Sequence, residues 1–404
     1  MEPVDQIREK VASRRAKVYT AAEFKTLVRN GKGRDADVVT CGTVGTMSGT
    51  MAVLSFRMCG PDVFRRADTL TLNGVPCVPG PCPNESLGIV DCVVYGTSRR
   101  DMSYGGGHLF RDIVSGAPIE ARITSEGDEY TGTVTIDDMP TARLFLTRGG
   151  FMNYTCFVNQ GEERSTIFSG IPGMPGHLEG ASVSGCGEIN PVQNDPSLRY
   201  LRMGAPVMID GARGMIMGTG TRSTPEKPCL SAFADMHDMD PSLMGGFLTS
   251  AGPECITSIA AAIPVTDYQA FRELSVTDDE VELPIADVSD RVPADSATYA
   301  SVWKGTEMCD ITELPDCHEC ARCSADENCP VSAMPSTRCA DNERCLKCGL
   351  CATTCVKHRF TAYLGHVDFK GRDVPIRLRQ SDRARAERMC QHLRNMVADG
   401  NWKI

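Results

Sequence analysis

Nine of the chain's 20 cysteines fall between Cys317 and Cys355, and their spacing is regular. Two runs of the form C-x2-C-x2-C, each followed by a further cysteine, are the ligand pattern of proteins with two [4Fe–4S] clusters. In that pattern the fourth cysteine of each run ligates the cluster of the other run. The predicted ligands are Cys317, Cys320, Cys323 and Cys355 for one cluster, and Cys345, Cys348, Cys351 and Cys329 for the other.

Structural zinc and disulfides are the other interpretations of these cysteines. Zinc ribbons favour two C-x2-C pairs with a longer gap between them, not three evenly spaced cysteines. The pattern departs from the bacterial one in two places, because five residues separate Cys323 from Cys329 and Val356 follows Cys355 where a proline is usual. The six cysteines of the two runs are therefore the firmer ligands, and Cys339 is an alternative to Cys329.

The overall composition is that of a globular protein. The chain has 404 residues, a length that allows two or three domains with a large core. Of these residues, 41% are hydrophobic and 23% are charged. It has no run of about 18 apolar residues, and its N-terminus lacks the apolar core of a signal peptide. We expect a cytoplasmic protein without a membrane partner, whose cysteines serve metal or thiol chemistry. The net charge of −10 argues against a nucleic-acid partner.

The local signals predict a mixed α/β fold with many short strands and glycine-rich loops, plus a small ferredoxin-like domain that holds the two clusters. Thr20 and Glu23 form a capping box for a helix that ends at Val28. Short turns predict three strand pairs, joined at Asn73-Gly74, Asp210-Gly211 and Lys370-Gly371. Ser381 is the expected cap of a C-terminal helix.

We expect three parts along the chain: a catalytic domain over residues 1–300, the cluster segment over 309–362, and a hairpin and helix over 363–404 that complete the catalytic domain. The stretch Cys41–Thr50 follows a short strand and is predicted to be a loop whose glycine amides could meet an anion, with a packing turn as the equally favoured alternative. Gly105–His108 reads as a flexible turn, and the acidic stretch Thr277–Asp295 as a linker.

Several stretches resemble a known protein family. They are Asp37–Thr50, Leu72–Pro76, Gly80–Glu85, Ser184–Glu188 with Asn190-Pro191, Gly218–Ser223, Ile263-Pro264 and Val374–Arg383. On these motifs the chain resembles methanogenesis marker protein 16 of archaea, a branch of the homocysteine-biosynthesis family. The resemblance extends over nearly the whole chain, and the cluster segment is fused near the C-terminal end.

The resemblance implies a sulfurtransferase that turns an aldehyde into a thiol. Similar family members make homocysteine from L-aspartate semialdehyde, and the methanogen branch is suited to make coenzyme M (2-mercaptoethanesulfonate) from sulfoacetaldehyde. In the homocysteine-forming members a cysteine lies about where Met47-Ser48-Gly49 lies here, and this chain lacks it. A second hypothesis is a non-catalytic electron carrier or assembly factor, and a third is a zinc-stabilised interaction protein.

Electron counting links this reaction to the cysteine-rich segment. Sulfide addition to an aldehyde followed by loss of water gives a thioaldehyde, which needs two electrons to become the thiol. Two one-electron clusters can supply that pair. The expected partners are a sulfide or persulfide donor and an external electron donor such as ferredoxin, and the sequence leaves a homo-oligomer open.

Two cysteines are candidate sulfur carriers because each lies in a tight loop, where backbone amides lower a thiol pKa. Cys82 lies in a proline-rich loop with Glu85 near enough to act as acid or base. Cys186 is flanked by two glycines that should leave its sulfur accessible, and Glu188 follows. Cys41 is a weaker candidate, and a buried, turn-filling cysteine is the alternative for each.

An anionic tail on the substrate needs guanidinium donors or backbone amides. Arg222 is the first candidate and Arg148 the second, although a surface arginine is the default interpretation of both. The amides of Gly42, Gly45 and Gly49 are further candidates for substrate binding. His108 and His177 are candidate proton donors, with a solvated loop histidine as the alternative.

Overall fold

The computed structural model describes residues 3–80, 84–303, 312–313, 320, 322–333 and 343–404. Within them, fourteen strands form one sheet in the order β1-β2-β16-β12-β13-β14-β9-β3-β6-β5-β4-β7-β8, and β15 pairs with β16. These strands are β1 (Val18–Thr20), β2 (Val38–Thr46), β3 (Thr50–Arg57), β4 (Thr69–Leu72), β5 (Val75–Pro79), β6 (Ile89–Tyr95), β7 (Ile119–Ser125), β8 (Asp128–Val134), β9 (Thr141–Gly149), β12 (Pro206–Ile209), β13 (Ala212–Thr219), β14 (Leu230–Asp235), β15 (Gly245–Thr249) and β16 (Gly252–Pro264).

Two smaller sheets complete the β-structure of the described residues. The order β18-β17-β10-β11-β22-β21 gives a six-stranded sheet, and β19 pairs with β20. Their bounds are β10 (Cys156–Val158), β11 (Ala181–Val183), β17 (Glu282–Asp287), β18 (Pro293–Thr298), β19 (Thr312–Glu313), β20 (Phe360–Thr361), β21 (His366–Phe369) and β22 (Arg372–Arg379). The mixed α/β class is therefore confirmed.

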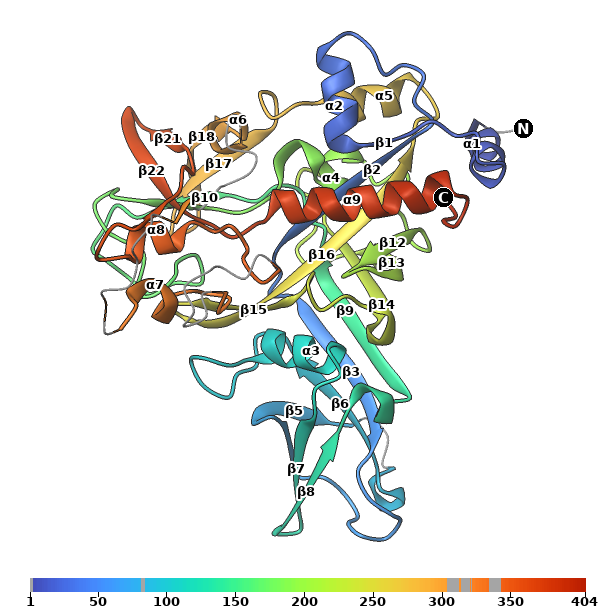
Figure 1. Ribbon diagram of the computed structural model, residues 1–404, viewed down its shortest axis with the longest axis vertical. Helices are drawn as coiled ribbons and strands as arrows, with labels where there is room; N and C mark the ends of the chain where they lie inside the picture. The colour runs from blue at the N-terminus through green and yellow to red at the C-terminus, as the bar shows by residue number, and fades with distance from the viewer. Residues whose placement is uncertain (1–2, 81–83, 304–311, 314–319, 321, 334–342) are drawn as a thin grey trace.

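The helices are mostly short and lie on the sheets (Figure 1). Their bounds are α1 (Pro3–Ala12), α2 (Ala21–Arg29), α3 (Gly106–Val114), α4 (Pro191–Asn194), α5 (Tyr268–Ser275), α6 (Ala300–Trp303), α7 (Ser324–Glu327), α8 (Leu350–Thr354) and α9 (Arg383–Ala398). Single 3₁₀ turns cover Glu85–Leu87, Ile136–Asp138, Gly187–Ile189 and Met236–Asp238. No helix within the described ranges has the length and apolar character needed to cross a bilayer.

The glycine-rich stretch after Asp37 is a strand, which corrects the predicted loop. β2 continues through Cys41 to Thr46 and pairs with β16 along its whole length. Gly42 permits this because a Cβ there would lie 2.8 Å from the sulfur of Cys390 on α9. A side chain at this position would push the helix off the sheet, since interiors are close-packed. Gly42 therefore serves packing between β2 and α9.

Local turn signals predicted several elements correctly. The turns at residues 73–74, 210–211 and 370–371 join β4 to β5, β12 to β13 and β21 to β22. Thr20 caps α2, and its capping box with Glu23 is present. The C-terminal helix is capped by Asp382, which accepts a hydrogen bond from the Arg385 amide, one residue later than the expected Ser381.

Two predicted loops are regular structure. The expected linker at 277–295 contains β17 and the start of β18. β17 pairs with β10, a partner more than 100 residues earlier, and such a distant partner leaves no local signal in an acidic stretch. The expected turn at 105–108 contains the beginning of α3, with Gly105 as its cap.

Candidate functional site

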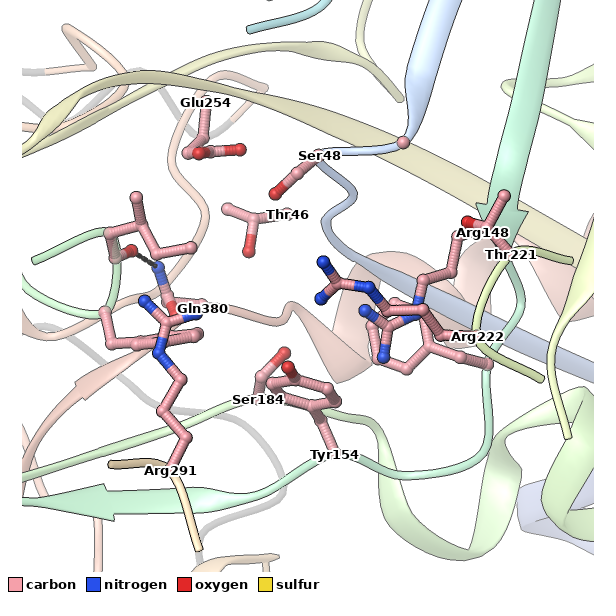
Figure 2. Close-up of a pocket in the computed structure, with 14 residues that line it drawn as sticks. Thr46, Ser48, Arg148, Tyr154, Ser184, Thr221, Arg222, Glu254, Arg291 and Gln380 are labelled. Atoms are coloured by element: carbon pink, nitrogen blue, oxygen red, sulfur yellow. Dashed lines mark hydrogen bonds between the residues drawn. The ribbon is translucent and has the colours of Figure 1, made fainter. Parts of the chain in front are cut away.

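A cavity of about 300 Å³ lies where the β2–β3 turn, the end of β9 and the start of β16 meet the loops around Arg222 and Arg291 (Figure 2). We call it the arginine cavity. It is lined by Thr46, Ser48, Gly49, Arg148, Phe151, Tyr154, Ile167, Phe168, Ser184, Thr221, Arg222, Glu254, Arg291 and Gln380. Three arginines and several hydroxyl groups make it a site suited to an anion.

Aromatic side chains hold two of the three guanidinium groups. Arg148 lies over the rings of Phe151 and Tyr154, at 5.5 and 5.4 Å from their centroids. Arg291 lies 5.0 Å from the centroid of Phe168. Stacking on a ring orients a guanidinium without neutralising its charge. The arginines thus keep their donors for a ligand.

Arg148 carries a direct sign of a missing partner. Its Nε is buried and has no hydrogen-bond partner among the described residues. A buried donor without a partner costs about 1–3 kcal/mol. An anion in the arginine cavity would remove that cost.

The acidic group of the cavity is Glu254, near the start of β16. Glu254 is 7% exposed, and its Oε2 atom is buried without a hydrogen-bond partner within the described residues. Burial raises the pKa of Glu254, and a side-chain hydrogen bond with Ser48 partly opposes this rise. Burial without a charged partner favours the protonated form of a carboxyl group over the ionised form.

The predicted substrate residues separate into two groups. Arg148, Arg222 and Gly49 line the arginine cavity. Gly42 packs on α9, and a Cβ on Gly45 would lie 2.7 Å from the carbonyl oxygen of Gln380. Neither of these two glycines lies among the lining residues of the arginine cavity, and both are closely packed against other segments.

Cys186 is buried, in contrast to the accessible thiol that its flanking glycines predicted. Cys186 is 0% exposed, and burial raises the pKa of its thiol to about 11. The thiol donates a weak hydrogen bond to the Val44 carbonyl at 3.7 Å. Cys41 is also fully buried, and burial raises its pKa to about 12. Both thiols are protonated at neutral pH in this structure.

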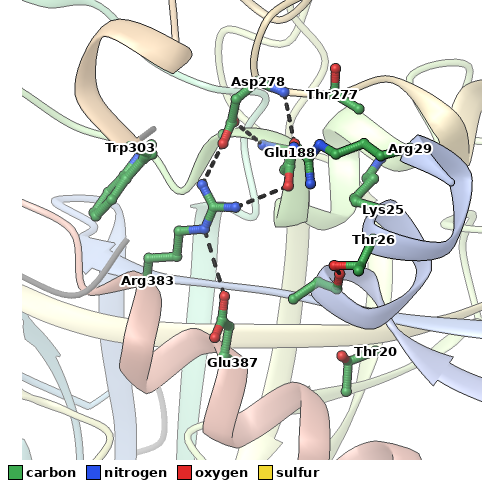
Figure 3. A network of polar contacts seen from close by, with 12 residues as sticks. Thr20, Lys25, Thr26, Arg29, Glu188, Thr277, Asp278, Trp303, Arg383 and Glu387 are labelled. Carbon is green, nitrogen blue, oxygen red and sulfur yellow. Dashed lines mark hydrogen bonds and ion pairs between the residues drawn. The ribbon is translucent and has the colours of Figure 1, made fainter. Parts of the chain in front are cut away.

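Glu188 belongs to a buried network of charges (Figure 3). Its carboxylate lies 2.6 Å from Arg29 on α2 and 3.1 Å from Arg383 on α9. Arg383 also lies 2.5 Å from Asp278, whose backbone amide donates to Glu188 at 2.8 Å. The network joins two helices to the 277–278 loop, so the geometry of Glu188 is that of a structural residue.

The remaining catalytic candidates lie apart from the arginine cavity or outside the described residues. Cys82 lies outside the described residues. Glu85 is 2% exposed in a 3₁₀ turn before β6. Burial lowers the pKa of His108 to about 4, and His177 lies at the surface, 3.4 Å from Glu162. None of these described side chains lines the cavity.

Most of the described cysteines of the predicted clusters lie near one another. Cys317 and Cys339 lie outside the described residues. Burial and the facing thiols of Cys329, Cys351 and Cys345 raise the pKa of Cys348 well above its usual value. The side chains of Cys323, Cys329, Cys351 and Cys355 pack around Ala325 and Phe360. Among the described residues, no three His, Cys, Asp or Glu side chains form a group that could hold a single metal ion.

This cysteine-rich segment lies against the end of β22 and the start of α9. Arg385 donates to the carbonyl oxygens of Glu343, Arg344 and Cys345 at 2.9–3.2 Å. The Arg379 amide donates to the Cys348 carbonyl at 3.0 Å, and the next residue, Gln380, lines the arginine cavity. One hydrogen bond and one peptide unit therefore connect the Cys348 backbone to the cavity wall.

Sequence reasoning missed Glu254, Arg291, Ser48, Tyr154 and Gln380 as cavity residues. The sequence does contain a signal for Glu254, because this carboxylate directly precedes the apolar run that begins at Cys255. Charged residues are rarely buried without a function or a partner. Arg291 lies in the stretch interpreted as linker. The others come from segments distant in sequence, which only the folded chain brings together.

Comparison with known proteins gives matches over most of the chain. A family model described as "Homocysteine biosynthesis enzyme, sulfur-incorporation" matches residues 16–404. An uncharacterized protein of Methanothermobacter thermautotrophicus is 43% identical over 407 residues, which cover 99% of this chain and 94% of the relative. An uncharacterized protein of Methanocaldococcus jannaschii is 37% identical over 396 residues, or 96% of this chain and 99% of that relative.

More distant relatives have a described activity. The L-aspartate semialdehyde sulfurtransferase of Methanocaldococcus jannaschii is 27% identical over 310 residues, which cover 71% of this chain and 58% of the enzyme. The enzyme of the same description from Methanosarcina acetivorans is 25% identical over 325 residues, with coverage of 75% and 63%. No solved structure matches the chain.

Proposed function

Because the chain belongs to the homocysteine biosynthesis enzyme family, we propose that it is a reductive sulfurtransferase that converts a small anionic aldehyde to a thiol. The observation that carries the proposal is the arginine cavity, where Arg148, Arg222 and Arg291 line about 300 Å³. That volume suits a molecule of a few heavy atoms. The guanidinium groups suit its anionic tail.

Sulfoacetaldehyde is the proposed substrate and coenzyme M the product. Its sulfonate presents three oxygen atoms, and the cavity presents three guanidinium groups. L-Aspartate semialdehyde, the alternative substrate, carries an ammonium group that needs an anionic partner. Within the described lining, Glu254 is the one acidic residue, against the three basic residues Arg148, Arg222 and Arg291. The charge balance of the cavity therefore favours the sulfonate.

The cysteine-rich segment is proposed to hold two [4Fe–4S] clusters, with the two ligand sets predicted from the sequence. The described arrangement supports the second set, because Cys329, Cys345 and Cys351 lie near enough to Cys348 to raise its pKa. Backbone amides also donate to the sulfurs of Cys329 and Cys355, at 3.3 and 3.4 Å. When bound, such clusters supply single electrons, and an external donor such as ferredoxin would reload them.

Cys82 and Cys186 are the proposed sulfur carriers, and free sulfide is the alternative. The described lining of the arginine cavity contains no cysteine. Cys186 is separated from solvent by its burial, although Ser184, two residues earlier, lines the cavity. A serine at each position, made in separate variants, distinguishes these carriers from free sulfide.

The direct test is product formation. Anaerobically reconstituted protein receives sulfide, a low-potential reductant and either sulfoacetaldehyde or L-aspartate semialdehyde in parallel reactions. We expect coenzyme M to form faster than homocysteine, as measured by mass spectrometry of the alkylated thiols. The absence of a thiol from both aldehydes contradicts the proposal and favours an electron carrier. Zinc in place of iron in the purified protein contradicts the cluster assignment.

A further inference from the structure

We propose that Glu254 is the acid that protonates the carbonyl oxygen of the aldehyde, an inference that rests on the proposed function. Glu254 lines the arginine cavity together with Ser48 and Thr46 of the β2–β3 turn. Figure 2 shows this group on one side of the cavity and the side chains of Arg148 and Arg222 on the other. An aldehyde whose anionic tail meets the arginines would point its carbonyl group toward Glu254.

The surroundings of the carboxyl group suit a proton donor. Its Oε2 has no hydrogen-bond partner among the described residues, although the residue is only 7% exposed. A buried polar atom without a partner is costly in a protein that has no other use for it. A carbonyl oxygen in the cavity would supply the missing partner.

The charged and titratable neighbours leave this group free to act. The charged side chains that share the cavity with Glu254 are Arg148, Arg222 and Arg291, and no described ion pair joins them to it. His108 of α3 lies against Gly246 of β15, the strand that pairs with β16. His108 is neutral, because burial lowers its pKa to about 4. The adjacent Cys255 is also neutral, since burial raises its pKa to about 12.

The reaction balances with this one acid. Hydrosulfide attacks the carbonyl carbon, the C–S bond forms, the C=O π bond breaks, and the proton of Glu254 moves to oxygen to give a thiohemiacetal. The Glu254 carboxylate then takes the S–H proton and returns it to the hydroxyl group, which leaves as water and gives the thioaldehyde. No electrons are exchanged to this point. A one-electron donor, acting twice, then reduces the thioaldehyde to the thiol as two protons are taken from solvent.

The test compares wild type with Glu254→Gln, which keeps the shape of the side chain but carries no acidic proton. With sulfide, reductant and sulfoacetaldehyde, we expect kcat to fall at least about 100-fold, the contribution typical of a positioned general acid. The dissociation constant of ethanesulfonate, a tail analogue without a carbonyl, should stay within about threefold of wild type. This binding measurement shows that the variant cavity is intact.

The pH profile separates a chemical role from a structural one. Burial raises the pKa of Glu254, so the acid is present below that pKa and is lost as pH rises through it. The ratio of wild-type to Glu254→Gln rates cancels the ionisation of sulfide, and we expect this ratio to fall with rising pH. Because Ser48 lowers the pKa of Glu254, Ser48→Ala should move the fall to higher pH. Glu254→Asp should recover part of the rate.

Each outcome decides between the two proposals. A Glu254→Gln variant that keeps its rate within about threefold of wild type, or a rate ratio independent of pH, overturns the role of Glu254 and leaves the sulfurtransferase intact. If Glu254→Gln raises only the KM for L-aspartate semialdehyde, the role of Glu254 as an acid is also overturned, because Glu254 would then bind the ammonium group of that substrate. A wild type that forms no thiol overturns both proposals.

Discussion

At the scale of single residues, the arginine cavity depends on guanidinium groups that aromatic rings orient and that no described carboxylate neutralises. Arg148 is the most constrained of them, since its Nε is buried and unpartnered among the described residues. Lysine cannot replace such a group. Its ammonium is a compact point charge without the planar fork that forms paired hydrogen bonds and lies flat on a ring.

We therefore expect Arg148→Lys to raise KM for sulfoacetaldehyde about 10- to 100-fold, the equivalent of one charged hydrogen bond of 1.5–3 kcal/mol. The change in kcat should be smaller, because the tail lies away from the reacting carbon. Steady-state rates of coenzyme M formation measure both quantities. Arg34→Lys is a matched control at an exposed arginine outside the cavity, and an equal effect of both substitutions would contradict a binding role for Arg148.

Much of the candidate site was beyond prediction from sequence because it depends on neighbours distant along the chain. Arg148 and Arg222 were chosen for their chemistry, and both line the cavity. Cys186 was chosen for its flanking glycines, but Val44 and other residues distant in sequence bury it. Glycine neighbours make a thiol accessible only if nothing else packs on it.

At the scale of elements, the network of Glu188, Asp278, Arg29 and Arg383 joins α9 and α2 to the loop before β17. Arg383 is 3% exposed, and its partners Glu188 and Asp278 are also buried, whereas its third partner, Glu387, is partly exposed. Removal of one partner from a buried ion pair leaves the other charges uncompensated. The network is thus needed for the helix to lie where it does.

We expect Arg383→Met to lower the free energy of unfolding by about 3–5 kcal/mol, as for other broken buried ion pairs. Urea denaturation under anaerobic conditions measures the change. Arg388→Met, at an exposed arginine of the same helix, should change it by less than about 0.5 kcal/mol. A loss of less than about 1 kcal/mol in Arg383→Met would mean that the network contributes little to stability.

The elements that sequence predicted are those whose signals are local. Asn73-Gly74 and Asp210-Gly211 adopt the left-handed backbone that a tight turn requires, so the hairpins were found. β17 was missed because its partner β10 is remote in sequence. β2 was cut short at Thr40 because its glycines resemble a loop, and the reason for them, the approach of α9, lies more than 340 residues away.

At the scale of the whole molecule, the cysteine-rich segment lies against the body of the protein. Arg385 is 2% exposed and donates to three consecutive carbonyl groups of the cysteine-rich segment. The Leu248 amide donates to the Pro330 carbonyl of the same segment at 2.7 Å. Through Arg379 and Gln380 the same segment reaches the wall of the arginine cavity. Its position and the shape of the cavity are therefore coupled.

We expect Arg385→Gln to loosen this contact. Hydrogen exchange of a peptide covering residues 343–355 should become at least about tenfold faster, because a charged hydrogen bond contributes about 1.5–3 kcal/mol. Mass spectrometry of the exchanged protein measures the rate. Arg388→Gln serves as the control on the same helix, and unchanged exchange in Arg385→Gln would contradict the docking role of Arg385.

The distribution of thiols has a consequence for the response of the molecule to oxygen. Among the described cysteines, only Cys59, Cys320, Cys323 and Cys329 are partly exposed, and three of these four belong to the cysteine-rich segment. Oxidants attack accessible thiolates first, and the buried thiols around β2 and α9 are protonated. Air would therefore oxidise the cysteine-rich segment before the buried thiols. Under the proposed function, the oxidised protein would still bind an anionic substrate but would no longer reduce it to the thiol.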